Sequence, residues 1–358
     1  MAANMKTDRL WDRETGDVFG ESVLFTESGE ARIAFPAAKI RKVYNPTLGH
    51  IYTEGTDYLA EPDGQIVRRP EGSAIPFLPA EIRYPAKEKA ILFPDKKANA
   101  IGVSTPSPTG LLCFDGGDFF ARHQVLIDYV TKSPLPELPR VSGKLPNTAK
   151  LLREGKMLDI AFIGDSITDG WNSSQKVGCA PGQPPWAGLV TQYLSALGTC
   201  RAFNGAVSGS GSRSAIEHFN ACCEKFVPSL LFIAYGMNDL SSLSAEEFGA
   251  NIRAVMKAGL ERNPDLEFVL VSQMSGNAEW DHTPAKKDTV YAIELERIAA
   301  ETEHRAFAPV NRLWHALTDE CGKPFLSVTG NGVNHPNDYG HRLYAAAVRG
   351  LFQGMGKR

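Results

Sequence analysis

A serine at the end of an apolar run is the first residue of this chain that could do chemistry. Ser166 lies in the sequence Gly164-Asp165-Ser166-Ile167, directly after the apolar run at residues 158–163. In open parallel sheets the ligand crevice lies outside the carboxyl ends of the strands, so a serine at this place would meet a substrate. Gly, Asp and Ser also favour turns and helix caps, so this motif alone leaves both interpretations open. The distinction depends on what the later loops carry.

Three later loops carry the residue types that acyl transfer requires. They are residues 204–209 (Asn-Gly-Ala-Val-Ser-Gly), residues 236–239 (Gly-Met-Asn-Asp) and residues 334–336 (Asn-His-Pro). A serine hydroxyl is a weak nucleophile at neutral pH, so it needs a base such as His335 within hydrogen-bond reach. The developing oxyanion needs donors, which a backbone N–H beside the serine, a glycine N–H and the amide of Asn238 can supply. We therefore expect Ser166, Asn238, His335 and one of two glycines, Gly205 or Gly209, to share a site.

The spacing of these loops predicts the elements that position them. From Met157 onward, apolar runs of strand length alternate with helical patterns. Such alternation is typical of a parallel sheet covered on both faces, and hence of a three-layer α/β domain in which the loops after successive strands gather at one edge. The expected strands lie at 158–163, 201–204, 229–235, 267–272 and 305–310, and the expected helices at 186–197, 214–226, 245–260, 285–302 and 339–351.

The N-terminal third has a different texture. Between about Gly20 and Val130, short runs of β type alternate with turn signals, which predicts an all-β sandwich or jelly-roll-like domain. Closely spaced prolines at 133–140 then favour a stiff, extended connector. We predict an accessory β-sandwich domain at 1–132, a proline-rich linker at 133–150 and the catalytic domain at 151–358. The expected N-terminal strands lie at 32–35, 39–44, 65–68, 90–93 and 111–114.

Composition excludes several classes of partner. The chain has 358 residues, a length that favours two domains, and its 38 basic and 41 acidic residues give a net charge of −3. That balance does not call for a nucleic-acid partner.

The start resembles no signal peptide and no run is long enough to span a bilayer. These features predict a cytoplasmic protein without a membrane partner, or a secreted or periplasmic one if a leader has been removed. The six cysteines form no C-x-x-C pair and are interpreted as free thiols.

Motifs for other chemistries are missing from the sequence. No His or Cys spacing fits a metal site, and Gly209-Ser210-Gly211 lacks the third glycine of a dinucleotide fingerprint, so we predict neither a metal nor a cofactor. No G-x-S-x-G elbow is present, which argues against the α/β-hydrolase superfamily. The sequence Asn172-Ser173-Ser174 matches the glycosylation pattern and is interpreted as fortuitous. Aromatic rings that could shape an acyl or sugar pocket, or pack in the core, are Trp171, Trp186, Trp280 and Trp314.

Taken in order, the GDSI, glycine-loop, GMND and NHP motifs resemble the SGNH/GDSL hydrolase family, a flavodoxin-like group of esterases, lipases and carbohydrate deacetylases. The resemblance covers roughly Met157 to the C-terminus. It implies that Ser166 is the nucleophile and an oxyanion donor, Gly209 the second donor, Asn238 the third donor and His335 the base. It favours Gly209 over Gly205 because the family's glycine falls at the end of this kind of loop.

One position departs from the family pattern. The family usually places an Asp shortly before the histidine to orient it, and the corresponding residue here is Asn331. Replacing such an Asp by Asn can favour the wrong imidazole tautomer, at a cost of about 10⁴-fold in a serine protease. The favoured explanation is a Ser-His dyad in which a backbone carbonyl orients His335. In the alternatives, Asp338 or Asp319 takes the role, Asn331 itself orients the ring, or Asn331 is an engineered change.

The two-domain layout resembles that of carbohydrate deacetylases within this family. The expected function is therefore a serine esterase that hydrolyses small acyl esters, acetyl esters above all, on carbohydrate. The substrate would be a small-molecule or oligosaccharide ester. Two alternatives stay open, a lipid or thioester hydrolase and a carbohydrate-binding protein whose catalytic site has decayed. The sequence makes no prediction of the oligomeric state.

Overall fold

A parallel five-stranded sheet in the C-terminal half positions the candidate residues. The computed structural model of the chain describes residues 9–104, 107–138, 144–284 and 287–356. The strand order is β12, β11, β13, β14, β15, which is second, first, third, fourth, fifth along this half of the chain. This is the order of flavodoxin-like sheets, in which ligands bind where the order reverses, beside the first strand. The bounds are β11 (Leu158–Gly164), β12 (Cys200–Asn204), β13 (Leu230–Ala234), β14 (Glu267–Val271) and β15 (Arg305–Ala308).

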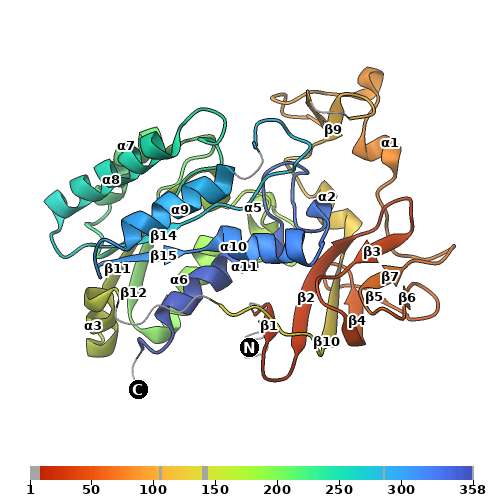
Figure 1. Cartoon of the computed structure of the whole chain (residues 1–358), viewed down its shortest axis with the longest axis horizontal. Helices are drawn as coiled ribbons and strands as arrows, with labels where there is room; N and C mark the ends of the chain where they lie inside the picture. The colour runs from red at the N-terminus through yellow and green to blue at the C-terminus, as the bar shows by residue number, and fades with distance from the viewer. Residues whose placement is uncertain (1–8, 105–106, 139–143, 285–286, 357–358) are drawn as a thin grey trace.

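Helices cover both faces of this sheet, which explains why its central strands are continuous apolar runs. Every residue of β13 and β14 is buried. Helices α7 (Ala215–Cys223), α8 (Ala245–Arg262) and α9 (Lys287–Ala299) lie on one face, and α6 (Trp186–Leu197) and α11 (Asp338–Arg349) on the other (Figure 1). The predicted three-layer α/β fold is confirmed. The first two residues of the expected helix 285–302 lie outside the described residues.

The remaining helices are short and join the larger elements. They are α1 (Ala80–Arg83), α2 (Phe119–His123), α3 (Pro146–Glu154), α4 (Ser166–Asp169), α5 (Ser174–Val177) and α10 (Val310–His315). A π-helical turn, Ala316–Glu320, extends α10. Single 3₁₀ turns occur at Lys87–Lys89, Ser212–Ser214, Phe325–Ser327 and Gly350–Phe352. Among the described residues, no helix combines the length and the apolar character needed to cross a membrane.

The N-terminal region is rich in antiparallel β-structure, as predicted. One sheet has the order β1, β2, β10, β4, β5, a second has the order β3, β7, β6, and β8 pairs with β9. The bounds are β1 (Trp11–Asp12), β2 (Asp17–Leu24), β3 (Glu30–Arg32), β4 (Ala37–Tyr44), β5 (Ile51–Tyr52), β6 (Leu59–Ala60), β7 (Ile66–Arg68), β8 (Ala100–Gly102), β9 (Leu111–Cys113) and β10 (Gln124–Thr131).

The expected N-terminal strands are partly wrong. Strands β4, β7 and β9 occur where expected, whereas the expected strand at 32–35 overlaps β3 only at Arg32. The apolar run at 90–93 is not a strand, because its side chains are exposed and only Leu92 forms an isolated bridge. No expected strand covers β2 or β10, two of the longest strands, which pair with each other in the five-stranded sheet. The apolar pattern of the sequence did not distinguish segments that pair as strands in a sheet from apolar runs that stay exposed to solvent.

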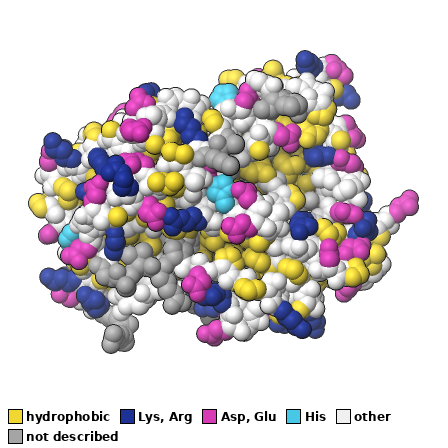
Figure 2. Space-filling model, in the orientation of Figure 1, with side chains coloured by type: hydrophobic (Ala, Val, Ile, Leu, Met, Phe, Trp, Pro, Cys, Tyr) yellow, Lys and Arg dark blue, Asp and Glu magenta, His cyan; other side chains and the backbone are white. Residues whose placement is uncertain are grey.

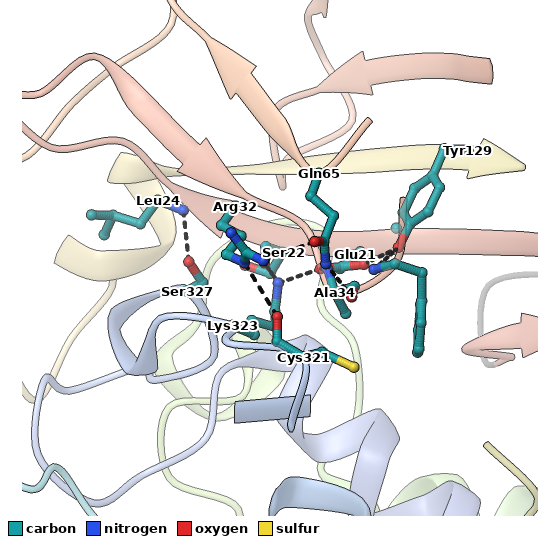
Figure 3. Close-up of polar contacts among 12 residues, drawn as sticks. Glu21, Ser22, Leu24, Arg32, Ala34, Gln65, Tyr129, Cys321, Lys323 and Ser327 are labelled. Carbon is teal, nitrogen blue, oxygen red and sulfur yellow. Dashed lines mark hydrogen bonds and ion pairs between the residues drawn. The ribbon is translucent and has the colours of Figure 1, made fainter. Parts of the chain in front are cut away.

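Buried polar contacts join the N-terminal sheet to the C-terminal half (Figure 3). Lys323 Nζ lies 2.5 Å from a carboxylate oxygen of Glu21 in β2, and both side chains are fully buried. Tyr129 of β10 donates its hydroxyl hydrogen to the other oxygen of Glu21 at 2.6 Å. Arg342 of α11 donates to the backbone carbonyls of Phe19 and Gly20. The N-terminal sheet is therefore held against the segments that lead to the candidate site.

One hydrophobic core cluster contains residues of both halves, from Val23 and Ile127 to Phe232 and Tyr344. Helix α3 spans residue 150, where the predicted linker ends, and residues 139–143 of that linker lie outside the described residues. The division at 132 and 150 stays a prediction.

On the surface, Lys and Arg side chains lie interspersed with Asp and Glu over the face in Figure 2, in keeping with a net charge of −3.

Candidate active site

Ser166 is the first residue of the short helix α4, directly after β11. Asp165 caps this helix, because its carboxylate accepts the N–H of Ile167 at 3.0 Å. Burial raises the pKa of Asp165 to about 7. Gly164 is required where the strand ends, because a Cβ there would meet the carbonyl oxygen of Ala234 at 2.5 Å. The turn therefore fixes Ser166 at the carboxyl edge of the sheet, with 6% of the residue exposed.

His335 faces Ser166. The distance between Ser166 Oγ and His335 Nε2 is 2.8 Å. The backbone of His335 is fixed as well, because its carbonyl accepts hydrogen bonds from the N–H of Gly330 at 2.8 Å and the hydroxyl of Thr329 at 3.0 Å. The structure thus brings together the two residues that the sequence placed 169 positions apart.

The other ring nitrogen of His335 contacts a residue that the sequence analysis did not assign to the site. His335 Nδ1 lies 2.8 Å from Oδ1 of Asn172. Asn172 follows α4 and is buried. Its only sequence signal was the Asn-Ser-Ser pattern, which points to glycosylation rather than to a buried site. Its role depends on contacts that no local pattern encodes.

Asn331, one of the alternatives for orienting the ring, does not lie beside Nδ1 of His335. Its Oδ1 accepts the backbone N–H groups of Val333, Asn334 and His335 at 2.9 to 3.0 Å. Its Nδ2 donates to Oδ1 of Asn334 at 2.9 Å. Asn331 therefore shapes the loop that carries His335, and its side chain is fully committed to that loop.

The two aspartates considered as substitutes also point elsewhere. Asp338 accepts the N–H of Ser174 at 2.8 Å, and Asp319 pairs with Nδ1 of His315 at 2.6 Å. Neither contact involves His335. A side-chain amide, rather than a carboxylate or a backbone carbonyl, faces Nδ1 of His335.

Burial keeps His335 neutral. Desolvation, with a smaller contribution from the neighbouring His341, lowers the pKa of His335 to about 3. Burial also lowers the pKa of His341 to about 4, and its Nε2 donates to the carbonyl of Trp171 at 3.2 Å. A neutral imidazole has one protonated and one unprotonated nitrogen, so His335 can accept the Ser166 proton at neutral pH.

The loop after β12 distinguishes its two candidate glycines. The N–H of Gly205 donates to Phe162 O at 2.9 Å, and a Cβ at Gly205 would meet Cys222 Sγ at 2.5 Å. Gly205 is therefore a packing residue whose donor is already used. Gly209 is exposed, has a φ of +79°, and would place a Cβ in open space. These differences favour Gly209 as the residue whose N–H faces a ligand.

Asn238 lies after β13 in the loop next to that of Gly209. One hydrogen of its Nδ2 bonds the carbonyl of Ser210 at 2.9 Å, which leaves the second hydrogen for a ligand. Asp239 ties the same loops together, because its carboxylate accepts from both the N–H and the hydroxyl of Ser212 at 2.9 Å. Since Ser166 is the first residue of α4, its own N–H has no partner within the helix. The arrangement can therefore offer several donors to a developing negative charge beside a Ser-His pair.

The chain matches the GDSL-like Lipase/Acylhydrolase family over residues 162–343, just over half of its 358 residues. Among solved structures, it is similar to an acetylxylan esterase from Geobacillus stearothermophilus, with 19% identity, a TM-score of 0.43, and coverage of 56% of this chain and 95% of that one. It is also similar to a two-domain esterase active on acetylated mannans, with 20% identity, a TM-score of 0.45, and coverage of 57% and 52%. No curated protein sequence matches the chain.

Proposed function

The chain belongs to the GDSL-like lipase/acylhydrolase family, and from this premise we propose that it is a serine esterase acting on small acyl esters, above all acetyl esters carried on carbohydrate. The observation that carries the proposal is the 2.8 Å contact between Ser166 Oγ and Nε2 of His335, whose pKa burial lowers to about 3. A serine bonded to a neutral imidazole is the arrangement that activates a hydroxyl for attack on a carbonyl.

In the proposed acylation step, Ser166 Oγ attacks the ester carbonyl carbon while His335 Nε2 takes the hydroxyl proton. The oxyanion that forms accepts hydrogen bonds from the N–H groups of Ser166 and Gly209 and from Nδ2 of Asn238. The carbonyl then reforms as the bond to the alcohol breaks, and the imidazolium gives its proton to the departing alcohol. The products of this step are the free alcohol and an acyl ester on Ser166.

Deacylation repeats the sequence with water. His335 Nε2 takes a proton from a water molecule as the water oxygen attacks the acyl carbon, and the same donors bind the second oxyanion. The bond to Ser166 Oγ breaks and the imidazolium returns its proton to the serine. The enzyme is restored and the carboxylic acid leaves.

Two indole rings support a sugar-bearing substrate. Trp171 and Trp280 are partly exposed, whereas Trp186 and Trp314 lie in the core. The backbone of Trp171 contacts the turn that carries Ser166, because its backbone N–H donates to the carbonyl oxygen of Ser166 at 3.0 Å. Trp280 lies in the loop whose Asn277 donates its amide to Gly332 O, three residues before His335. An aromatic ring that borders the site would offer an apolar face to the C–H groups of a pyranose.

The first test is removal of the nucleophile. Ser166→Ala should abolish hydrolysis of p-nitrophenyl acetate, because it removes the hydroxyl that forms the acyl intermediate in the proposed mechanism. Ser242→Ala, which changes an exposed serine before α8, serves as the matched control and should keep full activity. Unchanged turnover in Ser166→Ala would refute the proposal.

The second test compares substrates. Wild-type protein is assayed on acetylated oligosaccharides and on p-nitrophenyl esters of increasing acyl length, with kcat/KM as the readout. The proposal expects the highest values for acetyl esters. A steady rise toward long acyl chains, or a preference for thioesters, would indicate a lipid or thioester hydrolase. Glycan affinity without turnover of any ester would indicate a binding protein with a decayed site.

A further inference from the structure

The side chain of Asn172 is fixed at both ends. Its Oδ1 lies 2.8 Å from His335 Nδ1, and its Nδ2 donates to the carbonyl oxygens of Gly117 and Gly330, each at 3.1 Å. The residue is buried and has a φ of +62°, in the left-handed region that Asn adopts more readily than most residues. Gly330 must be a glycine, because a Cβ there would lie 2.4 Å from that of Asn172.

These contacts determine which way the amide of Asn172 points. A carbonyl oxygen only accepts hydrogen bonds, so the two carbonyls of Gly117 and Gly330 require the NH₂ end of the amide. Reversing the amide would leave three acceptors facing one another and both N–H hydrogens directed at the ring. The oxygen therefore faces His335, and Nδ1 must carry the ring proton to bond it. Nε2 is left unprotonated toward Ser166.

This arrangement explains how an amide can serve where the family uses a carboxylate. When Asn replaces the aspartate of a serine protease triad, the amide can turn its NH₂ group to the ring and hold the wrong tautomer, at a cost of about 10⁴-fold. Here the two carbonyls prevent that rotation. The neutral amide therefore orients the His335 ring and selects its tautomer without adding a negative charge.

We propose that Asn172 is the positioning residue for His335, and that the Gly117 carbonyl from the N-terminal β-rich region sets the orientation of Asn172. This inference rests on the proposed function of Ser166 and His335. Gly117 lies between β9 and α2, where its N–H donates to Asp115 at 2.8 Å, and the N–H of Asp115 in turn donates to Asn331 O at 3.3 Å. The N-terminal region thereby contributes an acceptor to the catalytic site of the other half.

The direct test reads the tautomer of His335 in the full-length wild-type protein. In ¹⁵N-labelled protein, NMR should show His335 with Nδ1 protonated and Nε2 unprotonated near neutral pH. The resonance is assigned by its loss in His335→Gln. A wild-type ring protonated on Nε2 would overturn the inference, and this measurement needs no variant at position 172 to fold.

The variant test removes the amide without disturbing the backbone. Asn172→Gly suits a φ of +62° and should lower kcat about 10- to 100-fold with little change in KM, because the base loses its orientation while the donors remain. It should also mix the two ring tautomers. Asn277→Ala is the matched control, since it deletes an amide that bonds Gly332 O on the same loop at 2.9 Å without touching the ring. This control should preserve the Nδ1-protonated tautomer.

The outcomes separate this inference from the proposed function. If Ser166→Ala stays active, the proposed function fails whatever happens at position 172. If Ser166→Ala is inactive while Asn172→Gly keeps wild-type kcat and a single Nδ1-protonated tautomer, only the positioning role of Asn172 fails. If Asn277→Ala changes the tautomer as much as Asn172→Gly does, the effect belongs to the loop and the role of Asn172 is likewise refuted.

Discussion

At the scale of single residues, the site is built around a half-buried imidazole with no carboxylate on its second nitrogen. Asn172 accepts from Nδ1 of His335 but carries no charge, so this contact does not offset the desolvation of an imidazolium, and Asp169 raises the pKa by less than burial lowers it. This accounts for a pKa of His335 near 3 rather than the usual 6.5. The resting histidine is therefore a neutral base over most of the pH range in which proteins stay folded.

The pH dependence of activity should follow from this low pKa. Because the neutral form of His335 is the active one, its loss on acidification is expected near the lowered pKa and not near 6.5. We expect kcat/KM to stay nearly constant from pH 7 down to about pH 5. Because the pKa of Asp165 is raised to about 7, the control is Asp165→Asn, and a profile that halves near pH 6.5 in both proteins while circular dichroism shows them folded would contradict this expectation.

The contribution of two neutral histidines to stability should fall over the same acidic range, opposed by Asp165 and Asp338, whose pKa values burial raises to about 7 and about 6. His335 and His341 have lowered pKa values in the folded chain, so the unfolded chain binds more protons as pH drops below 6.5. The favourable contribution of the two neutral rings is complete above pH 6.5 and is lost progressively toward the folded pKa values of about 3 and 4. The difference between wild type and His341→Gln in urea unfolding at a series of pH values measures the His341 part of this contribution. A His341→Gln variant whose midpoint varies with pH as the wild type does between pH 6.5 and 5 would be inconsistent with a buried neutral ring at this position.

Asn238 gives a second prediction at this scale. Removing one donor from an oxyanion site typically costs about 100- to 1000-fold in kcat. We expect Asn238→Ala to fall in that range on p-nitrophenyl acetate, with a smaller effect on KM. Asn251→Ala removes an amide that bonds the Ser212 hydroxyl, and it should stay close to wild type. Equal losses in both variants would argue against a special role for Asn238.

At the scale of elements, the site depends on how the His335 loop packs against the turn after β9. Gly332 has a φ of +89°, and a Cβ there would lie 2.4 Å from the carbonyl oxygen of Cys113 and 2.7 Å from the ring of Phe120. The backbone of the loop can approach the N-terminal region this closely only because Gly332 has no side chain. The same approach brings the Gly117 carbonyl within reach of Asn172.

Gly332→Ala should therefore be costly. The left-handed backbone contributes about 1 to 3 kcal/mol of strain, and the clash with Cys113 adds to it. Gly354→Ala is the control, because Gly354 has a similar φ of +80° but a Cβ there would meet nothing within 4 Å. Chemical unfolding of both variants should show the larger loss for Gly332→Ala, accompanied by reduced kcat. Equal destabilisation would mean that strain alone, without the clash, accounts for the effect.

At the scale of the whole molecule, a buried ion pair joins the two halves. Lys323 and Glu21 are fully buried, and burial lowers the pKa of Lys323. Lys323 also donates to the carbonyl of Ser22 at 2.6 Å. Removing one member of such a pair leaves the other charged group buried and unpaired, which typically costs about 3 to 5 kcal/mol.

Lys323→Met should lower the free energy of unfolding by about that amount. The double variant Glu21→Gln with Lys323→Met should recover much of the loss, because Gln keeps an acceptor for the N–H of Ala34 and leaves no unpaired charge. Unfolding curves of the two single variants and the double variant measure the coupling. Additive losses in the double variant would show that the pair does not act as a unit.

The sequence by itself determined the parallel sheet, its covering helices and the residues of the four loop motifs. These features are local, since an apolar run or a helical period is written in consecutive residues, and Ser166, Asn238 and His335 each follow or precede such an element. It also indicated a β-rich N-terminal region, although not its two long paired strands, β2 and β10, because strand pairing depends on residues about 100 positions apart. The partner of His335 Nδ1 was missed for a similar reason, because neither the favoured backbone carbonyl nor the alternatives Asn331, Asp338 and Asp319 contact that nitrogen. Only the tertiary structure showed that Asn172 contacts His335. The contact depends on Gly117 and Gly330, which lie 55 and 158 positions from Asn172 in the sequence and converge on its amide.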